Sequence, residues 1–196
     1  MARAGALILA AGAASRFGSD KRQALGPWQG PLLHHVLGLY RPLFADLAVV
    51  IGPDDRFGAE ACAAFGVTAL INPEPDLGMG RSLAVGIGWL AGRGLDAALI
   101  GLADMPWISS SVIARVTAAL LAEMRLVAPL WRGEIGFPRG IPAAYFAQLA
   151  SLSGDRGAGA LLDWRSALLL EEAEQGVVRD IDRPEDVFPD FVKRLD

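Results

Sequence analysis

The chain has very little of what cysteine and histidine chemistry requires. Its 196 residues include one cysteine, Cys62, and two adjacent histidines, His34 and His35. A lone cysteine forms no internal disulfide, and the alanines around Cys62 predict a buried structural thiol. Adjacent histidines point in different directions on a helix, which argues against a metal site built on them. The sequence therefore argues against a disulfide scaffold and a Cys/His catalytic pair, and it fits a reducing cytoplasm.

Long apolar runs and an excess of positive charge are also missing. No apolar run approaches the about 18 residues of a membrane span, and no signal peptide is apparent, so we expect neither membrane insertion nor secretion. The net charge is −4 and the isoelectric point is near 5.2. A general nucleic-acid binder normally carries a basic face. We therefore expect a cytoplasmic protein without a nucleic-acid partner, in which any phosphate site is local.

Short apolar runs alternate with helical patterns along the whole chain. Continuous apolar strands are typical of a parallel sheet covered on both faces, and the alternation indicates right-handed crossovers. We predict one domain, residues 1–196, with an α/β fold and a doubly wound, mostly parallel sheet. Expected strands lie at residues 6–10, 47–51, 67–71, 95–103, 126–130, 167–170 and 177–181, with helices at 31–43, 54–65, 83–90, 112–123 and 144–152. The spacing of Asp182 and Glu185 predicts a capping box for a last helix.

The first predicted strand runs into a loop of small residues that ends in two cations. From Leu9 the sequence reads L-A-A-G-A-A-S-R-F-G-S-D-K. Small residues let backbone N–H groups approach a polyphosphate, and Arg16 and Lys21 add positive charge. We predict a phosphate-binding loop with Arg16 and Lys21 as catalytic residues; an ordinary Gly/Ala turn with two solvated cations is the alternative. The residues expected against the nucleotide are Leu9, Ala10, Ala11 and Gly12.

Lysine is scarce in this chain, which gives Lys21 added weight. There are sixteen arginines, and the only lysines are Lys21 and Lys193. A lysine retained against such a bias indicates a need for a compact ammonium group. Neither G-x-G-x-x-G nor Gly-Lys-Ser/Thr is present, which argues against a nicotinamide-dependent dehydrogenase and a kinase-type ATPase.

Two later strand ends carry further polar candidates. Arg81 and Ser82 follow a long irregular loop, where Ser82 is either a nucleotide ligand or a helix N-cap. Asp104 stands at the end of a strongly apolar strand, before Met105-Pro106. Ligands of open α/β sheets bind at that edge, and a lone carboxylate beside phosphates suits Mg²⁺. We therefore predict that Asp104 is catalytic and binds Mg²⁺.

These motifs together resemble the molybdenum-cofactor nucleotidyltransferases, the MobA-like NTP transferase family. The resemblance rests on L-A-A-G-x-x-x-R-x-G-x-x-K at the first loop, N-x₅-G-M-x-x-S-L from Asn72, and L-A-D-M-P around Asp104. It extends to G-D-x-G-A at residues 154–158 and so covers nearly the whole chain. It implies that Asn72, Gly78, Arg81 and Ser82 contact the nucleotide. Asp155 is implied as a second metal or acceptor contact, with a turn and cap role as the alternative.

The resemblance also implies the reaction. We expect transfer of CMP from CTP to a phosphorylated acceptor such as molybdopterin cofactor, with release of pyrophosphate and with a molybdoenzyme or its chaperone as a partner. Ala11 matches the cytidylyl branch, whereas the guanylyl branch has glycine there. Phe137 stands where the family has histidine, which leaves residues 131–141 as an acceptor-side loop or a solvated connector. The alternatives are a guanylyltransferase, a non-catalytic molybdenum-cofactor carrier and a nicotinamide-dependent oxidoreductase.

Overall fold

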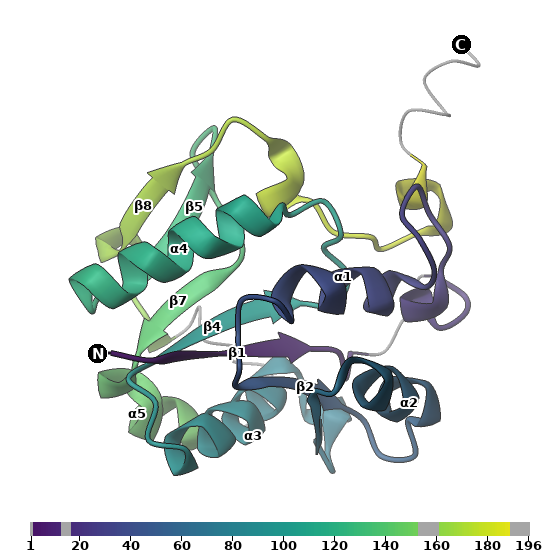
Figure 1. Cartoon of the computed structure of the whole chain (residues 1–196), viewed down its shortest axis with the longest axis horizontal. Helices are drawn as coiled ribbons and strands as arrows, with labels where there is room; N and C mark the ends of the chain where they lie inside the picture. Colours follow the sequence, from purple (N-terminus) through teal and green to yellow (C-terminus); the bar gives the residue numbers. More distant parts are fainter. Residues whose placement is uncertain (1, 13–16, 153–160, 189–196) are drawn as a thin grey trace.

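The protein folds around one mixed β-sheet, shown in Figure 1. The computed structural model describes residues 2–12, 17–152 and 161–188. Within these residues the sheet has eight strands in the order β3-β2-β1-β4-β7-β5-β6, and β8 pairs with β5. The strands are β1 (Ala4–Leu9), β2 (Leu47–Ile51), β3 (Thr68–Ile71), β4 (Ala97–Leu102), β5 (Val127–Trp131), β6 (Glu134–Ile135), β7 (Arg139–Pro142) and β8 (Leu168–Glu171). The predicted single-domain α/β fold with a mostly parallel sheet is confirmed.

Helices cover both faces of this sheet, as the unbroken apolar strands predict. They are α1 (Leu32–Tyr40), α2 (Arg56–Phe65), α3 (Met79–Gly92), α4 (Ser110–Glu123) and α5 (Phe146–Ala150). Successive strand residues point to opposite faces, so Ile8 joins the core under α1, α2 and α4, and Leu7 joins the core under α3 and α5. Figure 1 shows α1 and α4 on one side of the sheet and α3 and α5 on the other. Each such fully buried side chain stabilises the fold by roughly 1.5–3 kcal/mol.

The strand order reverses at β1, and this reversal positions the site. From β1 the chain first builds β2 and β3 on one side, and then returns to place β4 on the other side of β1. β1 and β4 are parallel and in register, with Leu9 opposite Leu102. The loop that follows Leu9 and the residues that follow Leu102 therefore leave the sheet at the same edge, where open α/β sheets bind ligands.

Side chains cap the first turns of two helices. Asp55 caps α2 by accepting a hydrogen bond from the Gly58 N–H at 2.9 Å. Ser109 caps α4, since its side chain accepts from the Val112 N–H.

In the part of the chain that the structure describes, no helix is long and apolar enough to cross a membrane.

Two expectations for the second half of the chain were wrong. The run predicted as a strand at 177–181 instead begins within a 3₁₀ turn, η5 (Gln175–Val178). Residues 131–141 are not a solvated connector, because they contain β6 and the start of β7, which pairs antiparallel with β4 and β5. The Phe137 N–H donates to the Val177 carbonyl at 2.7 Å, and a side chain at Gly136 would collide with that carbonyl. Val177 therefore packs over Gly136 and Phe137, which lie between β6 and β7. Its apolar character reflects this contact and not a position in a strand.

Candidate active site

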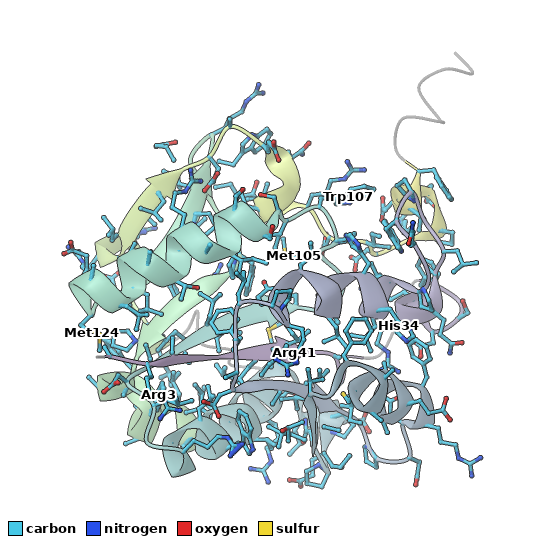
Figure 2. The ribbon with its side chains drawn as sticks, viewed as in Figure 1. Arg3, His34, Arg41, Met105, Trp107 and Met124 are labelled. Carbon is cyan, nitrogen blue, oxygen red and sulfur yellow. The ribbon has the colours of Figure 1, made fainter. Side chains whose placement is uncertain are left out.

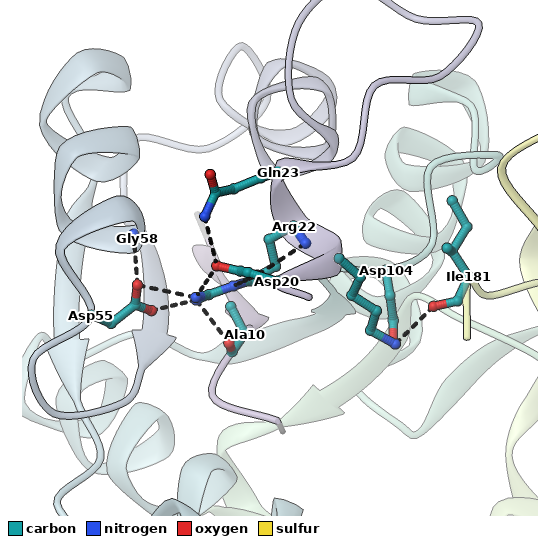
Figure 3. A network of polar contacts seen from close by, with 9 residues as sticks. Ala10, Asp20, Arg22, Gln23, Asp55, Gly58, Asp104 and Ile181 are labelled. Atoms are coloured by element: carbon teal, nitrogen blue, oxygen red, sulfur yellow. Dashed lines mark hydrogen bonds and ion pairs between the residues drawn. The ribbon is translucent and has the colours of Figure 1, made fainter. Parts of the chain in front are cut away.

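Lys21 joins two parts of the chain at the edge of the sheet. It opens a 3₁₀ turn, η1 (Lys21–Gln23), that Asp20 caps by accepting from the Arg22 N–H. The Lys21 ammonium donates to Asp104 Oδ2 at 2.7 Å, to the Ile181 carbonyl at 2.8 Å and to Asp182 Oδ1 at 3.3 Å. Figure 3 shows the first two of these bonds. The predicted pair of Lys21 and Asp104 is thus in direct contact.

The ammonium group stays charged in this setting. Partial burial lowers the pKa of Lys21, but the hydrogen bonds and negative charges of Asp104 and Asp182 outweigh that effect and leave the pKa above its ordinary value. Lys21 is therefore a permanent positive charge at neutral pH. A flexible, compact ammonium can also move from the carboxylates to a phosphate without a change of fold.

Three carboxylates gather around the Lys21 ammonium. Asp104, Asp180 and Asp182 each place one oxygen so that all three oxygens lie within 4.8 Å of one another. Burial and then the negative charges of Asp104 and Asp182 raise the pKa of Asp180, and Lys21 offsets part of this effect. Concentrated carboxylate charge of this kind attracts a cation.

The Asp104 carboxylate also has bonding capacity to spare. Its Oδ2 accepts from Lys21, whereas its buried Oδ1 has no hydrogen-bond partner among the described residues. A buried oxygen left without a partner costs about 1–3 kcal/mol. Oxygen ligands at this density fit a hard divalent cation, so Asp104 and its neighbours Asp180 and Asp182 are suited to hold one.

The assignment of Asp182 as a helix cap was wrong. The last helical segment is the 3₁₀ turn η6 (Pro184–Val187), whose N-cap is Arg183. Asp186 closes this turn by accepting from the N–H groups of Asp182 and Arg183. The Asp182 side chain is not the N-cap of η6, and its Oδ1 accepts from the Lys21 ammonium. Its role depends on a contact across 161 residues, which local spacing does not reveal.

A cavity of about 290 Å³ opens beside Lys21 and Asp104. Its walls come from the loop after β1, from the start of α3 and from the end of β4. Of the residues predicted to bind nucleotide or to be catalytic, those lining it are Leu9, Ala10, Ala11, Gly12, Lys21, Gly78, Ser82 and Asp104. Gly78 has φ 87°, a conformation that favours glycine, and it is the N-cap of α3 at the cavity wall.

The α3 loop separates residues that line the cavity from residues that support it. Ser82 is not an N-cap, because α3 begins at Met79 with Gly78 as its cap. Ser82 Oγ accepts instead from Asn72 Nδ2 at 2.9 Å, and both residues are buried. Asn72 therefore orients Ser82 from behind the wall. Arg81 does not line the cavity, and its Nε lies 3.3 Å from Glu74 Oε2 in an ion pair.

Arg22 connects three segments of the chain through its side chain, a role that was not predicted from the sequence. Its guanidinium donates to Asp20, to the Asp55 carboxylate at the start of α2 and to the Ala10 carbonyl at 3.1 Å, as Figure 3 shows. Burial lowers the pKa of Arg22, but the two carboxylates outweigh it and raise the pKa above its ordinary value. Arg22 thus fastens η1 to the end of β1 and to α2, next to Lys21. The local sequence signal was Asp20, two residues before Arg22, whereas the contact with Asp55 spans 33 residues and has no local signal.

The residues after Asp104 fix its position from the core side. Met105 is buried on the face of the sheet covered by α1 and α4 (Figure 2), and the Pro106 carbonyl lies 3.0 Å from His35 Nε2. His34 stacks with Phe57. Both histidines thus have packing or hydrogen-bonding roles. Cys62 is buried, as predicted. Two predicted site residues, Arg16 and Asp155, lie outside the described residues.

The fold and this site define a class of protein. A buried strand that opens into a loop of small residues, with a lysine and a carboxylate at the point where the strand order reverses, is the arrangement of a nucleotide-binding α/β enzyme. Residues 6–171 match the MobA-like NTP transferase domain, so the chain belongs to this nucleotidyltransferase family.

Individual relatives agree with this placement. The chain is 31% identical over 181 residues to the phosphoenolpyruvate guanylyltransferase of Sphaerobacter thermophilus, which covers 89% of this chain and 82% of that protein. It is 30% identical over 139 residues to the molybdenum cofactor guanylyltransferase of Rhodobacter capsulatus, which covers 66% and 69%. A Mycobacterium tuberculosis protein solved in complex with manganese shares the fold, with a TM-score of 0.69, 20% identity and 97% coverage of both chains.

Proposed function

We propose that this chain transfers a nucleoside monophosphate, with CMP from CTP preferred, to a phosphorylated small-molecule acceptor and releases pyrophosphate. The observation that carries the proposal is the meeting of Lys21 and Asp104 beside the cavity under the β1 loop. An oxygen of the acceptor phosphate forms a bond to the α-phosphorus of the nucleotide. The bond from that phosphorus to the bridging oxygen breaks, and its electron pair leaves with pyrophosphate.

The residues of the chain serve this step through charge and position. The Lys21 ammonium offsets negative charge on the leaving phosphates, an effect worth about 10²-fold or more in rate for one oriented donor. Gly12 and its small neighbours allow the phosphates to approach the backbone. No covalent enzyme intermediate is needed.

We propose Mg²⁺ as the cation, with Asp104 as its first ligand. The unpartnered Asp104 Oδ1 and the nearby Asp180 and Asp182 oxygens support this choice, and a protein of the same fold is known with manganese. When bound, the cation supplies positive charge to the phosphate oxygens. We retain Asp155, from the resemblance, as a proposed second contact, and Arg16 as a proposed partner of Lys21.

The preference for CTP rests on Ala11, which lines the cavity. In the guanylyl branch that the sequence resembles, glycine stands at this position, and the added methyl group crowds the larger guanine. Guanylyl transfer is the second candidate, because both curated relatives named above are guanylyltransferases. The acceptors of those relatives, molybdenum cofactor and phosphoenolpyruvate, are the two to consider here. A non-catalytic cofactor carrier is disfavoured because Lys21 and Asp104 are both present.

The proposed function is tested by combining each nucleotide with each candidate acceptor. Pyrophosphate release is measured for each of the four NTPs with molybdopterin cofactor, with phosphoenolpyruvate and with no acceptor, with Mg²⁺ and with chelator. We expect release only with an acceptor and a divalent cation, and fastest with CTP. NTP binding without release for every acceptor would favour the carrier, and the fastest release with GTP would favour the guanylyl candidate.

A further inference from the structure

Arg139 is a partly buried cation whose bonds are poor for a guanidinium group. It opens β7, and its guanidinium carbon lies 4.5 Å from the centre of the Phe137 ring and 4.9 Å from that of Trp164. Its Nε donates to the Gly136 carbonyl at 3.3 Å and its Nη2 to the Ile135 carbonyl at 3.4 Å. Both bonds are long, and other N–H groups of the five remain for a further partner.

No carboxylate within the described ranges forms an ion pair with Arg139. Burial lowers the pKa of Arg139, and no acidic side chain of residues 2–12, 17–152 or 161–188 raises it again. Arg22 is the opposite case, because two carboxylates raise its pKa. An unpaired, partly desolvated charge disfavours the folded state, and an apolar side chain avoids that cost. The two aromatic rings hold the guanidinium in place and leave it free for an anion.

The position of Arg139 relates it to the nucleotide cavity. β7 begins at Arg139 opposite Ile100 of β4, and Asp104 follows four residues after Ile100. At about 3.3 Å per residue, the backbone of Asp104 therefore lies at most about 13 Å from the level of Arg139, measured along the direction of β4. The cavity lies over β1 and β4, whereas Arg139 lies on the β7 side of β4. Trp164 belongs to the core under α3 and α5, and Ser82 of α3 lines the cavity, so both places are on the same face of the sheet.

We propose that Arg139 binds a second anionic group, a carboxylate, of the acceptor whose phosphate attacks beside Asp104. This proposal rests on the proposed function and narrows it, because it names small phosphorylated carboxylic acids as the acceptor class. The nucleotide lies on one side of Asp104 and the acceptor carboxylate on the other. Phe137, which departs from the family histidine, serves here as one of the two rings that hold the Arg139 guanidinium.

Acceptor kinetics test the proposal with four variants. Arg139→Gln and Arg139→Met remove the charge, Arg139→Lys keeps it without the planar fork, and Arg132→Gln is the matched control. Arg132 is an exposed arginine in the turn between β5 and β6 that also stacks on a ring, that of Trp131 at 4.9 Å. The substrates are phosphoenolpyruvate, which carries a carboxylate, and molybdopterin cofactor and ethyl phosphate as acceptors without one.

We expect Arg139→Gln and Arg139→Met to raise the KM for phosphoenolpyruvate by about 10- to 100-fold, the range for a lost charge-assisted hydrogen bond. The KM for the NTP and the rate with ethyl phosphate stay within about twofold of the parent, Arg139→Lys recovers part of the loss, and Arg132→Gln matches the parent. An unchanged KM for phosphoenolpyruvate, or an equal loss with all acceptors, would overturn the proposal. Turnover confined to molybdopterin cofactor and unaffected by Arg139→Gln would also overturn it.

Two further measurements separate this proposal from a structural role and from the proposed function. The Tm of Arg139→Met is expected at or above that of the parent, since an unpaired charge is replaced by an apolar side chain; a large fall in Tm with equal losses for all substrates would make Arg139 a packing residue. If the parent releases no pyrophosphate with any pair, the proposed function fails. In that case, calorimetric titration with phosphoenolpyruvate tests whether Arg139 binds the acceptor carboxylate. Binding by the parent that is lost in Arg139→Met supports the site, and equal or absent binding overturns it.

Discussion

Replacement of Lys21 by alanine separates two effects of its ammonium group. In the structure the ammonium neutralises a cluster of carboxylates, with Asp104 at 2.7 Å and Asp182 at 3.3 Å. In the proposed reaction it offsets charge on the leaving pyrophosphate. Lys21→Ala is therefore expected to lower transfer by about 10²-fold or more, or about 2.7 kcal/mol at 1.36 kcal/mol per tenfold.

The same substitution is expected to strengthen the binding of a divalent cation in the absence of nucleotide. Two unit charges 4 Å apart interact by about 1 kcal/mol in water, so a divalent ion gains about 2 kcal/mol, or roughly 30-fold, when Lys21 is removed. The assays are pyrophosphate release and calorimetric titration with Mn²⁺. Lys21→Arg should impair transfer without the gain in Mn²⁺ affinity, because it keeps the charge but not the compact shape. Lys193→Ala, at the only other lysine, should behave as the parent.

Either of two results would refute this reasoning about Lys21. Transfer by Lys21→Ala at the parent rate would remove the β1 loop from the proposed mechanism. Equal Mn²⁺ affinity in the parent and in Lys21→Ala would show that the ammonium does not oppose a cation at the carboxylates.

Four further predictions follow from the site and the core. Asp104→Asn should abolish metal-dependent turnover with little change in Tm, and a large fall in Tm with activity retained would make Asp104 structural. Asp182→Asn should weaken Mn²⁺ binding by about tenfold without a loss of stability; a lower Tm with unchanged Mn²⁺ binding would restore it as a cap. The parent should favour CTP over GTP by roughly 10- to 200-fold in kcat/KM, and Ala11→Gly should narrow this ratio; equal use of GTP by the parent contradicts the branch assignment. Burial, and then the charge of Asp55, raises the pKa of the Cys62 thiol to about 11, so a thiol reagent at pH 8 should label it only after denaturation, and rapid labelling of the native protein would show the thiol to be exposed.

The amino-acid sequence determined the elements whose signals are local. Strands β1, β2 and β4 were recognised because residues buried on both faces leave a continuous apolar run. The starts of α2 and α4 were predicted to within two residues, because caps such as Asp55 and Ser109 bond to N–H groups only a few residues away. Asp104 followed from a topological rule, since a residue at the carboxyl end of a strand lies at the ligand-binding edge of an open α/β sheet.

The tertiary structure alone decided which distant residues complete the site. Asp180 and Asp182 reach Lys21 because η5 packs over the residues between β6 and β7, and the chain then returns to the sheet edge. Arg139 contacts the rings of Phe137 and Trp164 because β7 runs antiparallel between β4 and β5 and because Trp164, 25 residues later in the chain, packs against it. Hydrophobic periodicity and capping motifs report interactions within a few residues. Contacts across 25 to 161 residues depend on how the whole core packs, and no short pattern in the sequence encodes them.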